Sequence, residues 1–283
     1  MKLLRTIGLA AILAAFLAGP AFAASGTVGL GTAGGYAILA ASTITNTGPT
    51  TIAGDVGLHP GSSVTGFNTV TLSGSQHVAD AAALQAKNDL VTAYNDAAGR
   101  PSTTVPAELG GSILKTGAYN SGSFGLTGTL TLDAEGVPTA VFVFQAASSL
   151  TTASGSSVAL INGAQACNVF WQVGSSATLG TSTSFKGSIL ALASITLTTG
   201  AKLEGRALAR NGAVTLDTNV ITRPGCSTTV VPTTVAPTGL APTSTSGPAN
   251  DGSSSVPSLM LLAAGLAAAA AFVTIRRLSS MQR

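Results

Sequence analysis

Charged residues are scarce in this 283-residue chain. They make up 8% of the sequence, against about a quarter in ordinary globular proteins, which disfavours a heavily charged helical surface. Removing the five basic residues near the two ends from the total of 13 leaves 8 basic against 10 acidic residues. Nucleic-acid binding requires a basic stripe, and the lack of one excludes that class of partner. The five terminal residues are Lys2, Arg5, Arg276, Arg277 and Arg283.

Residues that catalyse reactions or bind metals are also few. The two histidines, His59 and His77, have no carboxylate at a useful spacing, and two cysteines cannot complete a structural zinc site. Carboxylate pairs can cleave carbohydrates on parallel β-helices, but Asp133 and Glu135 lie in a turn and the other acidic residues are scattered. We therefore predict a protein that is not an enzyme, with no catalytic residue, metal site or cofactor.

The first 23 residues are typical of a secretory signal peptide. A basic start precedes an apolar run from Ile7 to Leu17, and small residues at Ala21 and Ala23 form a cleavage site. An uncleaved anchor is the alternative, although the apolar run is short for a bilayer span. We expect the protein to be exported.

Export permits a disulfide between the only two cysteines, Cys167 and Cys226. Closing a loop of this size would stabilise the fold by about 4 kcal/mol in the chain-entropy model. We predict this bond, with free thiols or an intermolecular bond as the open alternatives.

A short sequence motif is repeated between Ala177 and Ile221. It reads ATLGTSTSFKGSIL, then ITLTTGAKLEGRAL, and then a clipped VTLDTNVI, with steps of 18 and 19 residues. A short, uncharged period rich in Thr, Leu and Gly predicts coils of a parallel β-solenoid. Stacked coils place equivalent residues about 4.8 Å apart, so aligned threonines form ladders. The aligned threonines are Thr178, Thr196 and Thr215 in one column, and Thr181, Thr199 and Thr218 in another.

The sequence before the repeats predicts more strands and one helix. Short β-prone pieces occupy residues 25–74, and a helix is predicted at about 78–99 because good helix formers precede Gly99. Its apolar stripe should cover a flat side of the solenoid, while its charges form a solvated face. Residues 101–119 are expected to be a loop or cap over one end of the coils. The predicted stripe is Ala81, Leu84, Val91, Tyr94 and Ala98, and the charges are Asp80, Lys87, Asp89 and Asp96.

Three stretches carry a resemblance to a known family. The run of residues 160–221, GGYAILAASTITNTG near the start, and VADAAALQAKNDL in the helix resemble the DUF3494 ice-binding protein family. The resemblance spans residues 25–226. It implies a mainly β fold: a right-handed, three-sided, discontinuous parallel β-solenoid with one long flanking α-helix. It also implies that one flat side bearing Thr, Ser and Ala binds ice.

Family members often use a loose Thr–small–x–Thr/Asn pattern, which this chain meets only in part. Strand parity alone would place Thr181 and Thr199 on the side of Leu179 and Leu197, unless the chain turns a corner at Gly180 and at the residue before Thr199. A threonine ladder can also be scaffold alone, and a surface adhesin or polysaccharide-binding module is the alternative function. The candidate ice-binding residues are Thr152, Ser154, Thr181, Thr183, Thr199 and Thr218.

The C-terminal part changes character after residue 226. Residues 227–256 are rich in Thr, Pro and Ser and are expected to form a disordered stalk. Residues 257–275 are 19 uncharged residues that predict a transmembrane helix, and the basic residues 276–283 predict a cytoplasmic tail. We expect a monomer displayed at the cell surface that contacts ice or an extracellular polymer. Sorting to the cell wall is the alternative, from the motif at Leu240–Ser244.

Overall fold

The computed structural model describes residues 26–227. The predicted signal peptide, the stalk beyond Ser227, the segment 257–275 and the basic tail lie outside the described residues. Between residues 26 and 227, no helix is both long enough and apolar enough to cross a membrane.

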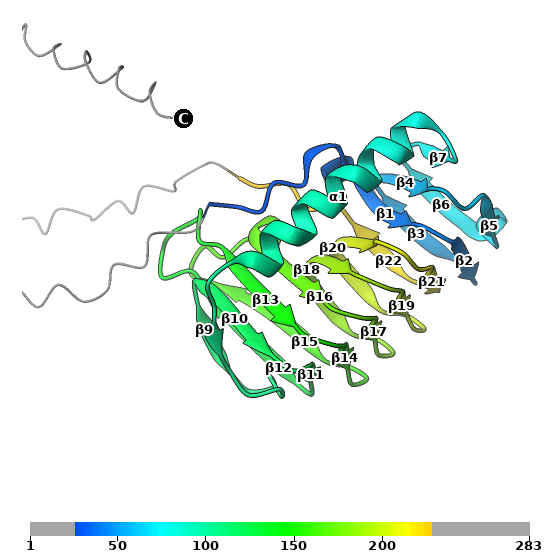
Figure 1. The fold of residues 1–283 in the computed structure, drawn as a ribbon. Helices are drawn as coiled ribbons and strands as arrows, with labels where there is room; N and C mark the ends of the chain where they lie inside the picture. Colours follow the sequence, from blue (N-terminus) through cyan, green and yellow to red (C-terminus); the bar gives the residue numbers. More distant parts are fainter. Residues whose placement is uncertain (1–25, 228–283) are drawn as a thin grey trace, which may run out of the picture. The chain divides into compact units, whose positions relative to one another are not determined.

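The described chain is a stack of β-strand coils with one long helix along its side (Figure 1). Every strand pair in it is parallel. Most coils contribute one short strand to each of three faces, so equivalent strands of successive coils pair across each face. The fold of residues 26–227 is therefore mainly β, with parallel sheets and one α-helix.

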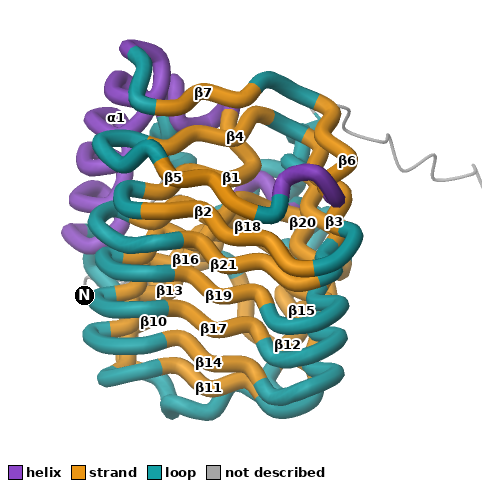
Figure 2. Tube along the Cα trace, turned by 90° about the vertical axis from the view of Figure 1, so that its right-hand side faces the viewer, coloured by secondary structure: helices purple, strands orange, loops and turns teal. Residues whose placement is uncertain are grey.

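The first face, which we call the threonine sheet, has seven strands (Figure 2). Their alternation of buried and exposed residues follows the period of two that a strand imposes on its side chains. In order along the solenoid they are β11 (Phe124–Leu126), β14 (Leu150–Thr152), β17 (Ala177–Leu179), β19 (Ile195–Leu197), β21 (Val214–Asp217), β2 (Thr43–Thr47) and β5 (Ser63–Thr65).

The second face lies under the helix, and the third face is open. The helix-covered face contains β8 (Thr103–Thr104), β10 (Gly117–Ser121), β13 (Phe142–Ala146), β16 (Val169–Val173), β1 (Tyr36–Ala40), β4 (Asp55–Leu58) and β7 (Gln76–Val78). The third face contains β9 (Ile113–Lys115), β12 (Thr129–Asp133), β15 (Ser157–Ile161), β22 (Val220–Thr222), β3 (Thr50–Ala53) and β6 (Val70–Ser73).

Two longer strands, β18 (Ser184–Ala191) and β20 (Lys202–Ala209), run from the third face into the helix-covered face. They pass the corner at Gly187 and Gly205, which pair with each other. A Cβ at position 205 would lie 1.9 Å from the Gly187 carbonyl oxygen. The corner therefore needs glycine because the two backbones approach too closely for a side chain.

The solenoid is discontinuous in sequence. Strands β1, β2 and β3 stack on β20, β21 and β22 from the far end of the described chain. After β7 the chain enters the helix, and the next strands, β8 and β9, belong to the opposite end of the stack (Figure 1). The strand β1 is fully buried along its length.

The helix α1 runs from Ala81 to Gly99, and the Asp80 carboxylate caps it by accepting from the Ala83 N–H at 2.8 Å. Residues 78–80, predicted as helical, lie before it. Only Tyr94 of the predicted apolar stripe is buried, so the predicted orientation of the helix was wrong. The buried side is largely alanine, and small side chains let the helix approach the sheet closely. The buried residues are Ala83, Ala86, Lys87, Leu90, Ala93, Tyr94 and Ala97.

Lys87 was predicted to be solvated and is instead buried under the helix, 7% exposed. Its ammonium donates to the carbonyl oxygens of Ala209 and Arg210. Burial, with a smaller contribution from the Arg210 charge, lowers the pKa of Lys87 to about 8. The lysine therefore joins α1 to the end of β20.

The segment 101–119 forms the last, incomplete coil and holds β8, β9 and the start of β10. Glu108 takes the place of a strand at the end of the threonine sheet. Its carboxylate accepts from the backbone N–H groups of Gly110 (2.7 Å) and Thr127 (2.8 Å). These backbone bonds hold the pKa of Glu108 below its usual value. The Leu109 N–H donates to the Gly125 carbonyl and the Gly125 N–H donates to the Ala107 carbonyl, so the edge of the sheet at β11 is partly paired.

The interior of the solenoid is mainly apolar, and aromatic rings fill the coils near the β8 end. The rings of Phe144 and Trp171 stack with centroids 4.0 Å apart, and Phe124 and Phe185 pack around Trp171. All four side chains are at most 2% exposed. Close packing of this kind makes the faces of the solenoid rigid.

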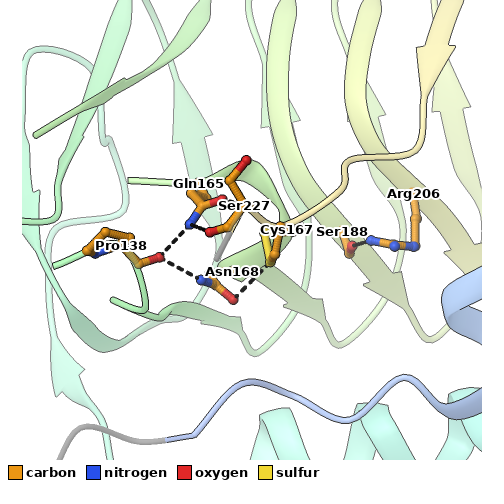
Figure 3. The surroundings of a disulfide bond; sticks show 8 residues. Pro138, Gln165, Cys167, Asn168, Ser188, Arg206 and Ser227 are labelled. Atoms are coloured by element: carbon orange, nitrogen blue, oxygen red, sulfur yellow. Dashed lines mark hydrogen bonds between the residues drawn. A yellow bond between two sulfur atoms is a disulfide. The ribbon is translucent and has the colours of Figure 1, made fainter. Parts of the chain in front are cut away.

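The predicted disulfide between Cys167 and Cys226 is present. Cys167 lies in the short 3-10 helix η3 (Ala166–Asn168); the described residues also contain the 3-10 helices η1 (Gly31–Gly35) and η2 (Phe67–Thr69). Figure 3 shows the surroundings of the bond, where Gln165 donates to the carbonyls of Pro138 and Ser227. The bond and these contacts hold the last described residues against the coils.

Candidate functional site

The threonine sheet carries one outward-facing threonine from each of six neighbouring coils. All six are exposed or half-exposed, and parallel pairing sets neighbours about 4.8 Å apart. We call this column the strand ladder. Each member pairs directly with the next, in the order Thr151, Thr178, Thr196, Thr215, Thr45 and Thr65.

The residues beside each ladder threonine point into the core. Ala177 and Leu179, on either side of Thr178, are at most 1% exposed, and the same is true of Ile195 and Leu197 beside Thr196. The ladder is therefore the outer half of strands whose inner half is fixed by packing. Its hydroxyl and methyl groups form a fixed array that costs little entropy to order.

A second column lies at the corner between the threonine sheet and the third face. At this corner each coil has a residue with left-handed backbone, such as Gly155, Ser182 and Gly200. The N–H of this residue donates a hydrogen bond to a backbone carbonyl of the next coil, at 2.8 to 3.0 Å. That carbonyl belongs to the residue immediately before the left-handed residue of the next coil. We call those stacked residues the corner column: Ser154, Thr181, Thr199, Asp217 and Thr47.

Three of the predicted site residues lie in the corner column. Ser154, Thr181 and Thr199 are all exposed. The strands β17 and β19 end at Leu179 and Leu197, so the chain turns before the two threonines and strand parity no longer applies. The structure thus brings these three residues beside the strand ladder.

The prediction that Thr152 and Thr183 lie on the contact surface was wrong. They are 4% and 0% exposed, and their hydroxyls lie 2.8 Å apart. Thr152 follows the ladder residue Thr151 and therefore points inward, where neighbouring strands place leucine. Thr183 comes after the left-handed Ser182 and turns into the core. Neither side chain can contact an external surface.

Thr218 was predicted to be equivalent to Thr199, but it lies one residue beyond the position equivalent to Thr199. It has φ of 55° and occupies the left-handed position, equivalent to Gly200 rather than to Thr199. Two residues separate Thr196 from the corner residue Thr199, whereas only one separates Thr215 from Asp217. In this step the ladder residues Thr196 and Thr215 are therefore 19 apart, while the corner residues Thr199 and Asp217 are 18 apart. Aligning Thr218 with Thr199 by the ladder step produced the error.

The strand ladder itself was not among the predicted site residues. The alignment of Thr178, Thr196 and Thr215 between buried positions was a usable signal for its central part. Thr45 and Thr65 could not have been added from the repeats, because they come from N-terminal coils that join the stack only in space.

The three faces differ sharply in charge. The third face carries the ion pairs Lys115–Glu135 and Lys186–Glu204 and the exposed Lys202, and the helix covers the second face. Asp217 is the only charged residue in the seven strands of the threonine sheet. Of the described surfaces, the threonine sheet is therefore the flat, uncovered and almost uncharged one.

Comparisons with known proteins agree with this architecture. The family described as Ice-binding-like matches residues 38–222. An ice-binding protein of Nostoc sp. (strain HG1) is 53% identical over 197 residues, covering 68% of this chain and 73% of that protein. An ice-binding protein from an Antarctic biological consortium has a TM-score of 0.68 at 51% identity, covering 70% of this chain and 91% of the other. One from the Antarctic ascomycete Antarctomyces psychrotrophicus has a TM-score of 0.68 at 40% identity, covering 71% and 100%.

Proposed function

Because this chain belongs to the ice-binding-like family, we propose that it binds ice and that the strand ladder and corner column are the contact surface. The observation that carries the proposal is the unbroken column of six outward threonines, Thr151 to Thr65, on an uncovered sheet. The relatives named above are ice-binding proteins.

The physical basis of ice binding is that many weak contacts between the surface and ordered water add together. One threonine hydroxyl gains little from ice, because liquid water offers equal hydrogen bonds. A rigid array can hold many surface waters in a fixed pattern at once, and little further ordering is required on binding. Each hydroxyl anchors a water, while the adjacent methyl group leaves an apolar gap that does not compete for hydrogen bonds. Strongly hydrated charges on the third face make that face a poor partner for ice.

Display at the cell surface belongs to the same proposal. The signal peptide, stalk and transmembrane segment predicted from the sequence would tether the domain outside the cell. Both ends of the described domain lie away from the threonine sheet: the Gly26 carbonyl accepts from Arg100 beside α1, and the Ser227 N–H donates to Gln165 next to η3. A tether at either end would leave the contact surface free. The domain would then hold cells to ice.

Ice-affinity partitioning of the purified protein tests the proposal. A slowly growing ice front should incorporate the protein in excess over a globular protein of similar size that lacks ice affinity. Exclusion from the ice would contradict ice binding. Retention on surface polysaccharides together with exclusion from ice would support the adhesin alternative instead.

A further inference from the structure

Asp217 interrupts the corner column. The other four members carry hydroxyl groups, and all of them are exposed. The backbone of Asp217 follows the column pattern, because its carbonyl accepts from the Gly200 N–H at 3.0 Å. Only the side chain departs from the pattern, and it places a carboxylate where a hydroxyl is expected.

The carboxylate also engages two neighbouring hydroxyls. Thr199 Oγ1 donates to one of its oxygens and Thr218 Oγ1 donates to the other, the latter at 2.9 Å. The Thr199 hydroxyl therefore directs its proton along the column toward Asp217 rather than toward an external water. Asp217 thus changes two positions of the surface: its own and that of Thr199.

The strand ladder continues past this point without a break. Thr215, two residues before Asp217, pairs with Thr196 on one side and Thr45 on the other. The interruption is therefore confined to the corner, and the fold does not require it, since Thr47 occupies the equivalent place in the next coil.

We infer that Asp217 limits ice contact at the corner column and so determines how much of the surface binds ice. This inference rests on the proposed function. An ionised carboxylate keeps a tightly held hydration shell, and removing or reordering that shell is costly. Ice contact then extends along the corner from Ser154 to Thr181 and weakens at Thr199, while the ladder remains in contact along its length.

Two substitutions separate charge from shape. Asp217→Thr restores the column, and Asp217→Asn keeps the shape and an acceptor oxygen while removing the charge. Both should partition into ice more strongly than the unmodified protein, by about twofold or more, the equivalent of about 0.4 kcal/mol. Thr218→Gly is the matched control, because it changes the neighbouring hydroxyl and leaves the carboxylate in place. It should partition like the unmodified protein.

The outcomes are distinguishable. If the unmodified protein enters ice and the folded Asp217 variants do so equally or less, the inference is wrong and the proposed function stands. An increase in Thr218→Gly as large as that in Asp217→Asn would also contradict it, since Thr218→Gly still carries the Asp217 carboxylate. If neither the unmodified protein nor any variant enters ice, the proposed function fails together with the inference. Thermal unfolding of each variant verifies that it is folded.

Discussion

The hydroxyls of Thr152 and Thr183 form a hydrogen bond of 2.8 Å inside the solenoid. Thr152 Oγ1 also accepts from the Gly180 N–H at 2.8 Å, and Thr183 Oγ1 donates to the Ala153 carbonyl. Two threonines from the Thr-rich sequence therefore stabilise the corner from within. Their role is structural, so substituting them should change the stability of the protein but not its contact with ice.

Thr152→Val should destabilise the protein without changing ice binding. The substitution removes the acceptor for the half-buried Gly180 N–H and one partner of the buried Thr183 hydroxyl, which costs about 1–3 kcal/mol. Urea unfolding measures the effect, and Thr151→Val on the outer side of the same strand is the control, expected to change stability by less than about 0.5 kcal/mol. Equal effects of the two substitutions would contradict the burial of Thr152.

Stability should increase with pH in the alkaline range because of Lys87. Its folded pKa is about 8 against 10.5 for the ordinary value, so between these values the unfolded chain binds the additional proton. The free energy of unfolding therefore rises with pH across that window. The two carbonyl acceptors favour the charged amine and reduce the effect, which we expect to be about 1–3 kcal/mol in total.

Urea unfolding between about pH 7 and about pH 9.5 measures this slope. The range stays below the titration of Tyr36 and Tyr119, whose pKa values burial raises and which act in the opposite direction. In Lys87→Met the slope should largely disappear. An unchanged slope in the variant would show that another group is responsible.

Reduction of the disulfide should lower stability while leaving the coils assembled. The bond closes a separation of 59 residues, which corresponds to about 4 kcal/mol in the chain-entropy model. The double variant Cys167→Ser, Cys226→Ser should therefore unfold at a clearly lower temperature and still bind ice below it. Loss of ice binding in the folded double variant would contradict this prediction, because it would show that the disulfide is needed for ice binding and not only for stability.

The sequence predicted the parts of the fold that depend on local repetition. The 18-residue step and the aligned threonines indicated the coils, and the resemblance implied their discontinuous order. The orientation of α1 was not predictable from large apolar residues, because the buried side is mostly alanine and Leu84 lies 43% exposed. The role of Lys87 depends on the carbonyls of residues 209 and 210. These residues are far from Lys87 in the sequence, so the contact could not be predicted from it.

The site was predicted in part for the same reasons. Thr181 and Thr199 were identified because their repeats have equal length, and Thr218 was misplaced because its repeat has one residue fewer before the corner. Thr152 and Thr183 follow the composition of a contact surface, but strand parity and the turn after Ser182 point them inward. Composition alone does not distinguish the two sides of a strand.

The central claim is that the threonine sheet is the surface that contacts ice. Its most direct test is ice-affinity partitioning of Thr196→Tyr, at the centre of the strand ladder, beside Thr51→Tyr, an exposed residue of β3 on the third face. A bulky ring at position 196 should reduce incorporation into ice by about tenfold or more, the equivalent of about 1.4 kcal/mol, and the ring at position 51 should leave it unchanged. Retained incorporation in folded Thr196→Tyr, with loss in Thr51→Tyr, would contradict the account.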